Sequence, residues 1–353
     1  MTIRFAPPPS ALDAQAAALR IAFGPVVFQC VRIVRKLGLL DSLDQAVRLD
    51  VATLAARHAL SEYAVSVLLE TCLSAQVVAF EDEQYSLTKV GYFVLHDDMA
   101  RINTDFIHDV CYRGLFDLEA SLREELPLGL KSLGDWPTLY EGLTQLPEPA
   151  RSSWFAFDHL YSDSAFAKIL PLVFATAPKT LMDIGANTGK WARHCLAHDA
   201  DVHLTLVDLP HQLAIARETM RAAGTESRAS FAEINVLDRA VAFPPNHDAI
   251  WMSQFLSCFS LSVIDSIFAR ARAALAESGR LYVLDTFWDR QQHEISAYCL
   301  INTSPYFTAM ASGNSKMYRS QDYIESARRQ GLELVDIRDG LGICHSLLTF
   351  AAR

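Results

Sequence analysis

Hydrophobic and polar positions follow a helical period in the first hundred residues. Apolar side chains recur three or four residues apart, as at Val27, Val31 and Val34 before Gly38, and this spacing predicts helices. Two short runs rich in β-forming residues, separated by an acidic turn, then predict a hairpin. The predicted helices are residues 26–37, 50–58 and 62–74, the last with Ser61 as N-cap, and the predicted strands are 77–80 and 85–88. Three helices followed by a two-stranded wing predict a mostly α winged helix within residues 1–105.

After residue 106 the pattern changes. Residues 100–149 read as a helical connector and residues 152–174 as one further helix. Short strand-like runs then alternate with helical patterns, which is typical of an α/β fold with a parallel sheet. The predicted strands are 180–184, 203–207, 229–234, 247–252, 280–285, 332–337 and 345–351, and the predicted helices are 190–198, 210–223, 261–276 and 323–330. The last two strands form a terminal hairpin, so residues 106–353 are predicted to hold a Rossmann-like sheet of seven strands.

A glycine turn follows the first strand of that sheet. In open parallel sheets, ligands bind beyond the carboxyl ends of the strands, where this chain places Asp183 and Asp208. A dinucleotide fingerprint would continue from Gly185 with two more glycines, but Asn187 and Lys190 stand in their places. The Asp183 carboxylate would repel a pyrophosphate and suits the cationic amino-acid end of a ligand, while Asp208 is placed to accept from ribose hydroxyls.

Charge and cysteine content restrict the function. The formal net charge of −10 argues against a nucleic-acid surface, and the helix 61–75, in the recognition position of the winged helix, has no Lys or Arg but carries Glu62 and Glu70. Its apolar content, with that of residues 23–28, better suits a dimer interface. Seven scattered cysteines without a C-x-x-C pair, and no uninterrupted apolar run of about eighteen residues, predict a reduced cytoplasmic protein with no metal site and no membrane partner.

The pattern D-x-G-x-x-x-G at Asp183, Gly185 and Gly189 resembles the first motif of class I S-adenosylmethionine-dependent methyltransferases. Together with LGLLDSL, DIGANTG, LVDLP and residues 253–259, it extends the resemblance to the small-molecule O-methyltransferases that include plant caffeate and bacterial polyketide and phenazine enzymes. The resemblance implies S-adenosyl-L-methionine as methyl donor, S-adenosyl-L-homocysteine as product, a homodimer formed by the N-terminal domain, and a small aromatic or polyketide-like acceptor.

The resemblance also implies which residues bind the donor. Beyond the third strand the family commonly holds adenine with a carboxylate or an amide, which leaves Asn235 and Asp238 as alternatives here. The expected donor-binding residues are Asp183, Gly185, Asn187, Gly189, Asp208, Leu209, Asn235, Val236, Asp238 and Ser253.

One family residue is replaced. The family reads S-x-x-L-H-D-W, its histidine being the general base, whereas Ser257 stands at that position here. A phenol of pKa about 10 is mostly protonated at neutral pH, so a positioned base contributes about 10²- to 10⁴-fold, and serine cannot act as that base alone. The family's orienting glutamate is also absent before Arg319. The candidate substitutes are His159, which we prefer, His108, His345, Asp158 and Tyr161.

The expected catalytic residues are thus His159, Tyr161 and Ser257, and the expected acceptor pocket is formed by Trp154, Asp158, Phe307 and Met310. Without the histidine, two reactions stay open: methylation of a hydroxyl oxygen, or of an activated aromatic or enol carbon. A third hypothesis, of another class, is a non-catalytic regulator that binds S-adenosylmethionine or DNA.

Overall fold

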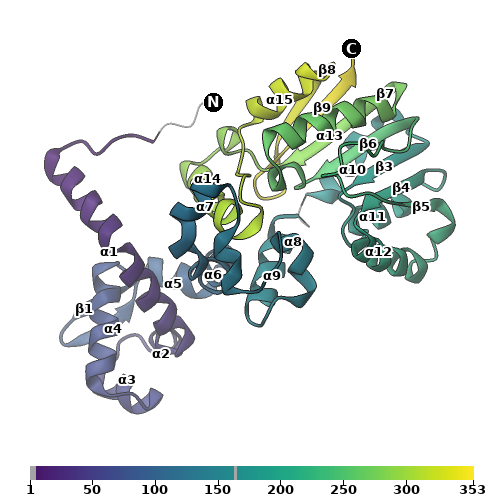
Figure 1. Cartoon of the computed structure of the whole chain (residues 1–353). Coiled ribbons are helices and arrows are strands. Elements are labelled where there is room, and N and C mark those ends of the chain that lie inside the picture. The colour runs from purple at the N-terminus through teal and green to yellow at the C-terminus, as the bar shows by residue number, and fades with distance from the viewer. Residues whose placement is uncertain (1–4, 163–164) are drawn as a thin grey trace. The chain divides into compact units, whose positions relative to one another are not determined.

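The computed structural model describes residues 5–162 and 165–353, without the side chains of residues 161 and 162. The chain forms two compact units, Phe5–Asp109 and Val110–Arg353 (Figure 1). The division falls close to the change of pattern predicted after residue 105.

The first unit contains the predicted three helices and wing, with additional helices. Its elements are α1 (Ala11–Lys36), α2 (Leu39–Gln45), α3 (Val51–His58), α4 (Glu62–Ser74), β1 (Val78–Glu81), β2 (Gln84–Leu87), α5 (Lys89–His96) and α6 (Asp98–Phe106). Helix α1 begins at Ala11 rather than at residue 26, because the Ser10 side chain caps it by accepting from the Asp13 N–H. Residues 39–45 form α2, which was not predicted, because Leu39, Leu40 and Leu43 are buried on one side of it.

Helix α1 exposes much of its apolar surface. Leu12, Leu19, Ile21, Phe23 and Val26 are all more than half exposed. Among the described residues, α1 is the one helix long and apolar enough to cross a membrane by length and composition, and only 6% of its apolar window is buried. Arg20 and Arg32 interrupt that apolar run.

The second unit begins with short helices. They are η1 (Ile107–Cys111), which spans the division, η2 (Gly114–Asp117), α7 (Leu118–Glu124), η3 (Leu128–Ser132), α8 (Leu139–Gly142), η4 (Leu143–Gln145), α9 (Ala150–Ser162), α10 (Phe166–Val173) and η5 (Phe174–Thr176). The single helix expected over residues 152–174 is therefore two helices, α9 and α10. Helix α9 ends at Ser162 and α10 begins at Phe166; residues 163 and 164 lie outside the described part of the chain.

A seven-stranded sheet organises the rest, as predicted. Its order is β5 (Ala229–Glu233), β4 (His203–Asp208), β3 (Thr180–Ile184), β6 (His247–Ser253), β7 (Leu275–Asp285), β9 (His345–Ala352) and β8 (Leu332–Leu341). The first five are parallel, and β9 runs antiparallel to both β7 and β8. Strand β7 begins five residues before the predicted start at 280, because residues 275–279 continue it past an irregularity opposite β6.

Helices cover both faces of this sheet (Figure 1). They are α11 (Lys190–His198), α12 (Pro210–Ala222), α13 (Leu261–Ala274) and α15 (Ser320–Arg329), besides α10. Alternate residues of β3 point to opposite faces: Leu181 packs in one core with α10 to α12, and Met182 packs in the other with α13 and α15. Both faces of the sheet are thereby buried. Polar strand residues therefore lie at the carboxyl ends of the strands.

Between β7 and α15 the chain adds η8 (Trp288–Arg290), α14 (Glu294–Tyr306) and η9 (Phe307–Ala311). Helix α14 was not predicted. It buries Ala297 and Leu300 but exposes Ile295 and Tyr298, so its apolar residues show no one-sided period.

Candidate active site

A cavity of about 430 Å³ lies in the second unit at the carboxyl ends of four parallel strands. Asp183 from β3, Asp208 from β4, Ser253 from β6 and Asp285 from β7 all line it. Helices α9 and α14 supply further wall residues. The volume is that of a typical small-molecule site.

The glycine turn after β3 forms the floor of one half. Gly185 has φ +79°, and a Cβ added there would lie 2.4 Å from Cδ2 of Phe255, so no other residue fits. Asn187 also has a positive φ, 49°. Gly189, with φ +75°, is the N-cap residue of α11 and lies against Ala216, behind the cavity wall. It sets the course of the backbone between β3 and α11 and does not line the cavity.

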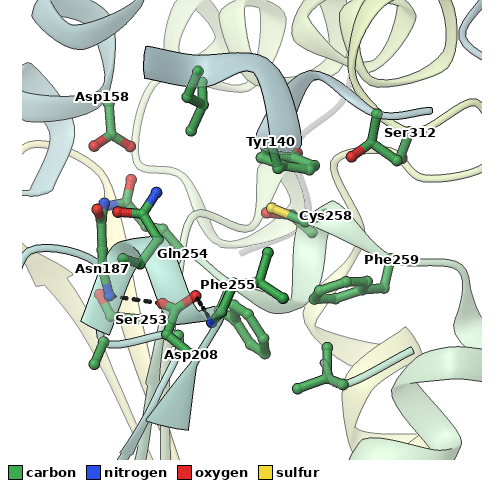
Figure 2. Close-up of a pocket in the computed structure, with 18 of the residues that line it drawn as sticks. Tyr140, Asp158, Asn187, Asp208, Ser253, Gln254, Phe255, Cys258, Phe259 and Ser312 are labelled. Carbon is green, nitrogen blue, oxygen red and sulfur yellow. Dashed lines mark hydrogen bonds between the residues drawn. The ribbon is translucent and has the colours of Figure 1, made fainter. Parts of the chain in front are cut away.

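Asp208 is held by the turn it faces. Its Oδ2 accepts from the Asn187 N–H at 2.8 Å and its Oδ1 from the Leu209 N–H at 2.7 Å (Figure 2). Burial raises the pKa of Asp208, and the two N–H donors act in the opposite direction. The carboxylate is thus fixed at the cavity wall, with lone pairs left for a ligand.

Asp183 is buried, with 2% of its surface exposed, and its Oδ2 has no hydrogen-bond partner among the described residues. Burial, with the charge of Asp208, raises the pKa of Asp183 to about 8. An unpartnered buried carboxyl oxygen is costly unless a ligand satisfies it. A cationic or N–H-bearing group is the matching ligand.

The turn after β5 places Asn235, but not Asp238, on the cavity wall; these are the two residues expected to contact adenine. Asn235, Val236 and Leu237 line the cavity. Asp238 is not part of the wall, because its Oδ1 turns back to accept from the Ala240 N–H at 3.0 Å. The Oδ1 of Asn235 accepts from the Leu237 N–H at 3.0 Å, which leaves its amide N–H groups for a ligand.

The other half of the cavity is aromatic. The Trp154 Nε1–H of α9 donates to the Tyr306 hydroxyl of α14 at 2.8 Å, and Phe307 follows on the same wall. Met310, expected in the pocket, is fully buried behind it, with its Sδ against Gly114. Asp158 lines the cavity and points toward Gln254 (Figure 2).

Tyr140, which was not singled out from the sequence, and Cys258 face each other in this half (Figure 2). Burial raises the pKa of the Cys258 thiol to about 12, so the thiol stays protonated at neutral pH and is a weak nucleophile. Burial likewise raises the pKa of Tyr140. Both therefore present neutral hydrogen-bonding groups.

The candidate bases are dispersed. His159 lines the cavity but is exposed, and the Tyr161 side chain lies outside the described residues. His108 belongs to the other unit, with its Nδ1 2.7 Å from Asp109. His345 is fully buried in β9 away from the wall, and burial lowers its pKa to about 4, so it is no substitute base.

Ser257 lies on η7 (Leu256–Cys258), directly beside a carboxylate that the sequence reasoning missed. Its backbone N–H donates to Asp285, which is 2% exposed at the end of β7. Asp285 lies at the carboxyl end of a buried strand, as Asp183 and Asp208 do, and that signal could have identified it.

Two family models match the chain. One, described as a Dimerisation2-like domain, matches residues 15–85, and the other, described as a methyltransferase domain, matches residues 182–281. The second match contains the turn at Gly185, Asp183, Asp208, Asn235 and Ser253. The chain is an S-adenosylmethionine-dependent methyltransferase.

Similar proteins agree with this. The L-tyrosine C(3)-methyltransferase of Streptomyces lavendulae is 22% identical to this methyltransferase over 88% of this chain and 85% of its own. The structure of the S-adenosylmethionine-dependent methyltransferase SibL superposes with a TM-score of 0.71 at 20% identity, covering 95% of this chain and 98% of its own. That of the O-methyltransferase NcsB1, solved with S-adenosylmethionine and 2-hydroxy-5-methyl naphthoic acid, superposes with a TM-score of 0.64 at 18% identity, covering 92% and 96%.

Proposed function

We propose that this methyltransferase transfers a methyl group to a hydroxyl oxygen of a small aromatic acceptor. The observation that carries the proposal is that one cavity joins a polar half, with Asp183, Asp208 and Asn235, to an aromatic half with Trp154 and Phe307. The similar enzyme NcsB1 was solved with a hydroxynaphthoic acid, an acceptor of this chemical class.

The polar half fits the donor. Asp183 would accept from the amino-acid ammonium, because its free Oδ2 needs such a partner. Asp208 would accept from the ribose hydroxyls, and the Asn235 amide would contact adenine. Leu209, Val236 and Ser253, also on the wall, would contact the rest of the molecule. When bound there, S-adenosylmethionine supplies a sulfonium methyl group for direct transfer.

The aromatic half would orient the acceptor and exclude water. The hydrogen bond from Trp154 to Tyr306 joins α9 to α14, so this wall holds its shape across distant parts of the chain. Holding the acceptor atom in line with the methyl group lowers the activation free energy of transfer through proximity and orientation.

Methylation of carbon is the second candidate. Ser257 replaces the histidine base of the O-methylating family, and the similar enzyme of Streptomyces lavendulae is named for a C(3) position of L-tyrosine. A ring carbon ortho to a phenol hydroxyl is made nucleophilic by the ring itself.

The first unit would form a homodimer. The match to a Dimerisation2-like domain over residues 15–85 and the exposed apolar residues of α1 support this proposal. We further propose a cytoplasmic enzyme without a nucleic-acid or membrane partner, in accord with its acidic recognition helix and reduced cysteines.

Isothermal titration with S-adenosylmethionine and S-adenosylhomocysteine tests the donor site. Wild-type protein should bind both, and Asp208→Ala should lose at least tenfold in affinity, since a hydrogen bond to a charged group contributes about 1.5–3 kcal/mol. Asp201→Ala is the matched control, because Asp201 lies before the opposite end of β4. Absence of binding by the wild type would overturn the proposal.

The acceptor atom is tested by incubating the enzyme with isotope-labelled donor and a panel of phenols. NMR of the product distinguishes an aryl methyl ether from a methyl group on carbon. An ether supports the main proposal, and a C-methyl product establishes the second candidate instead.

A further inference from the structure

Asp285 is the one buried carboxyl group on the aromatic side of the cavity among the described residues that no donor-binding role explains. It lies at the end of β7, beside Ser257, Cys258 and Thr286 on the cavity wall. Ser257 stands where the related O-methyltransferases carry their base, and its backbone N–H donates to the Asp285 carboxylate.

Three donors hold this carboxyl group. The Thr286 N–H donates to Oδ1 at 2.8 Å, the Tyr323 hydroxyl donates to Oδ2 at 3.1 Å, and the Ser257 N–H also donates to the carboxylate. A carboxylate offers about four lone-pair sites. One acceptor site is therefore left, on a group whose orientation is fixed from three directions.

We propose that the Asp285 carboxylate accepts the proton of the acceptor hydroxyl; this inference rests on the proposed function. The O–H bond of the acceptor breaks, the proton passes to Asp285, and the electron pair stays on the acceptor. That pair, on the acceptor oxygen, forms the new bond to the methyl carbon while the C–S bond breaks and leaves its pair on sulfur.

The surroundings give this carboxyl group a suitable acidity. Burial raises the pKa of Asp285 to about 7, although its three donors act in the opposite direction. The other titratable groups that face it are Cys258, Tyr323 and Cys344, and burial raises the pKa of each of them. They are neutral near pH 7, so Asp285 is the group that titrates there, and a base is most effective with a pKa near the working pH.

Phenol itself is a suitable probe, because with a pKa of about 10 it stays neutral between pH 5 and 9. Calorimetric titration of phenol into the S-adenosylhomocysteine-saturated protein should show binding that weakens severalfold as the pH falls through about 7. Asp285→Asn should bind phenol more weakly and without this pH dependence. The infrared band of the protonated carboxylic acid that phenol perturbs in the wild type should be missing in the variant.

Tyr323→Phe provides a second variant that keeps the buried ring. Because the Tyr323 hydroxyl lowers the pKa of Asp285, its removal should move the midpoint of the phenol titration to higher pH. A residue that only supported the fold would leave that midpoint in place.

His159→Ala is the competing variant, since His159 is the candidate base that we preferred from the sequence and it lines the cavity. A pH dependence that disappears in His159→Ala and persists in Asp285→Asn would overturn the assignment of Asp285. With a methylated phenol in hand, Asp285→Asn should lower kcat about 10²- to 10⁴-fold, and an unchanged kcat would also overturn it. Failure to methylate any phenol would instead contradict the proposed function, while the phenol titration would still decide the role of Asp285.

Discussion

Asp183 and Asp208 end neighbouring parallel strands, and the charge of Asp208 adds to burial in raising the pKa of Asp183 to about 8. Asp183 is consequently protonated in the free protein at pH 7. A bound ammonium group favours the ionised form. Binding of the donor ammonium at Asp183, as proposed, would therefore be coupled to release of a proton.

The first prediction concerns this coupling. The affinity for S-adenosylmethionine should rise with pH up to about 8, approaching tenfold per unit at lower pH, because the proton on Asp183 competes with the ligand cation. Calorimetry at pH 7 in buffers of different ionisation enthalpy should detect the released proton. In Asp183→Asn the affinity should be lower and the release absent; an equal release from that variant would assign the proton to another group.

The raised pKa of Asp183 also predicts that stability falls as pH rises, whereas donor affinity rises. The folded-state pKa of Asp183 lies above its usual value of 3.8, so between about pH 4 and 8 the folded protein holds a proton that the unfolded chain has lost. The free energy of unfolding therefore falls as pH rises through this range, by at most about 1.4 kcal/mol per unit. Asp183→Asn should melt at a higher temperature than the wild type at pH 8, with the difference shrinking toward pH 4. Equal melting temperatures at pH 8 would contradict the assignment.

Asn235 and Asp238 form a matched pair three residues apart. Asn235→Ala should weaken donor binding by about fivefold, because one hydrogen bond to adenine contributes about 1 kcal/mol. Asp238→Ala should bind the donor like the wild type, since its carboxylate turns to the Ala240 N–H. The reverse result in donor titrations would place the adenine contact on Asp238.

Alanine substitutions at Gly185 and Gly224 distinguish the cost of backbone strain from the cost of a steric clash. Both have a positive φ, but a Cβ at Gly185 would lie 2.4 Å from Phe255, whereas nothing lies within 4 Å of one at Gly224. Gly224→Ala should cost about 1 kcal/mol in chemical denaturation. Gly185→Ala should cost more and should also abolish donor binding, and similar losses in both variants would show that the contact with Phe255 is unimportant.

Trp154→Phe removes the hydrogen bond to Tyr306 but keeps an aromatic ring in the wall. A neutral hydrogen bond contributes about 0.5–1.5 kcal/mol, so the variant should lose about that much stability. The KM for the acceptor should rise while donor affinity stays near the wild-type value. A loss confined to donor affinity would contradict the division of the cavity into two halves.

The polar half of the site could be predicted from the sequence, because in an open parallel sheet ligands bind beyond the carboxyl ends of the strands. Strand β3 and helix α11 have the bounds expected for them, since the glycine turn marks where one ends and the other begins. Asp183 and Asp208 then follow from the position of polar residues at strand ends. The same rule applies to Asp285 at the end of β7, which was not among the predicted residues.

Other features depended on tertiary contacts. The sequence offered Asn235 and Asp238 equally as the residue that contacts adenine. The hydrogen bonds within the loop after β5 decide between them, because they leave Asn235 on the cavity wall and direct Asp238 away from it. Helix α14 has apolar residues on buried and exposed sides and contains Pro305, so periodicity did not detect it. Met310 was expected in the pocket from its place near Phe307, but it packs against Gly114, from a segment distant in sequence.

The position of β9 between β7 and β8 has a consequence for synthesis of the enzyme. Asp285 pairs with Ser346 across this strand, so the edge of β7 that carries the reactive end of the cavity is covered by residues 345–352. Until those residues have left the ribosome, β7 exposes an unpaired edge of the kind that promotes aggregation. A nascent chain can thus complete the glycine turn after β3 early, but the β7 side of the cavity is complete only when β9 inserts.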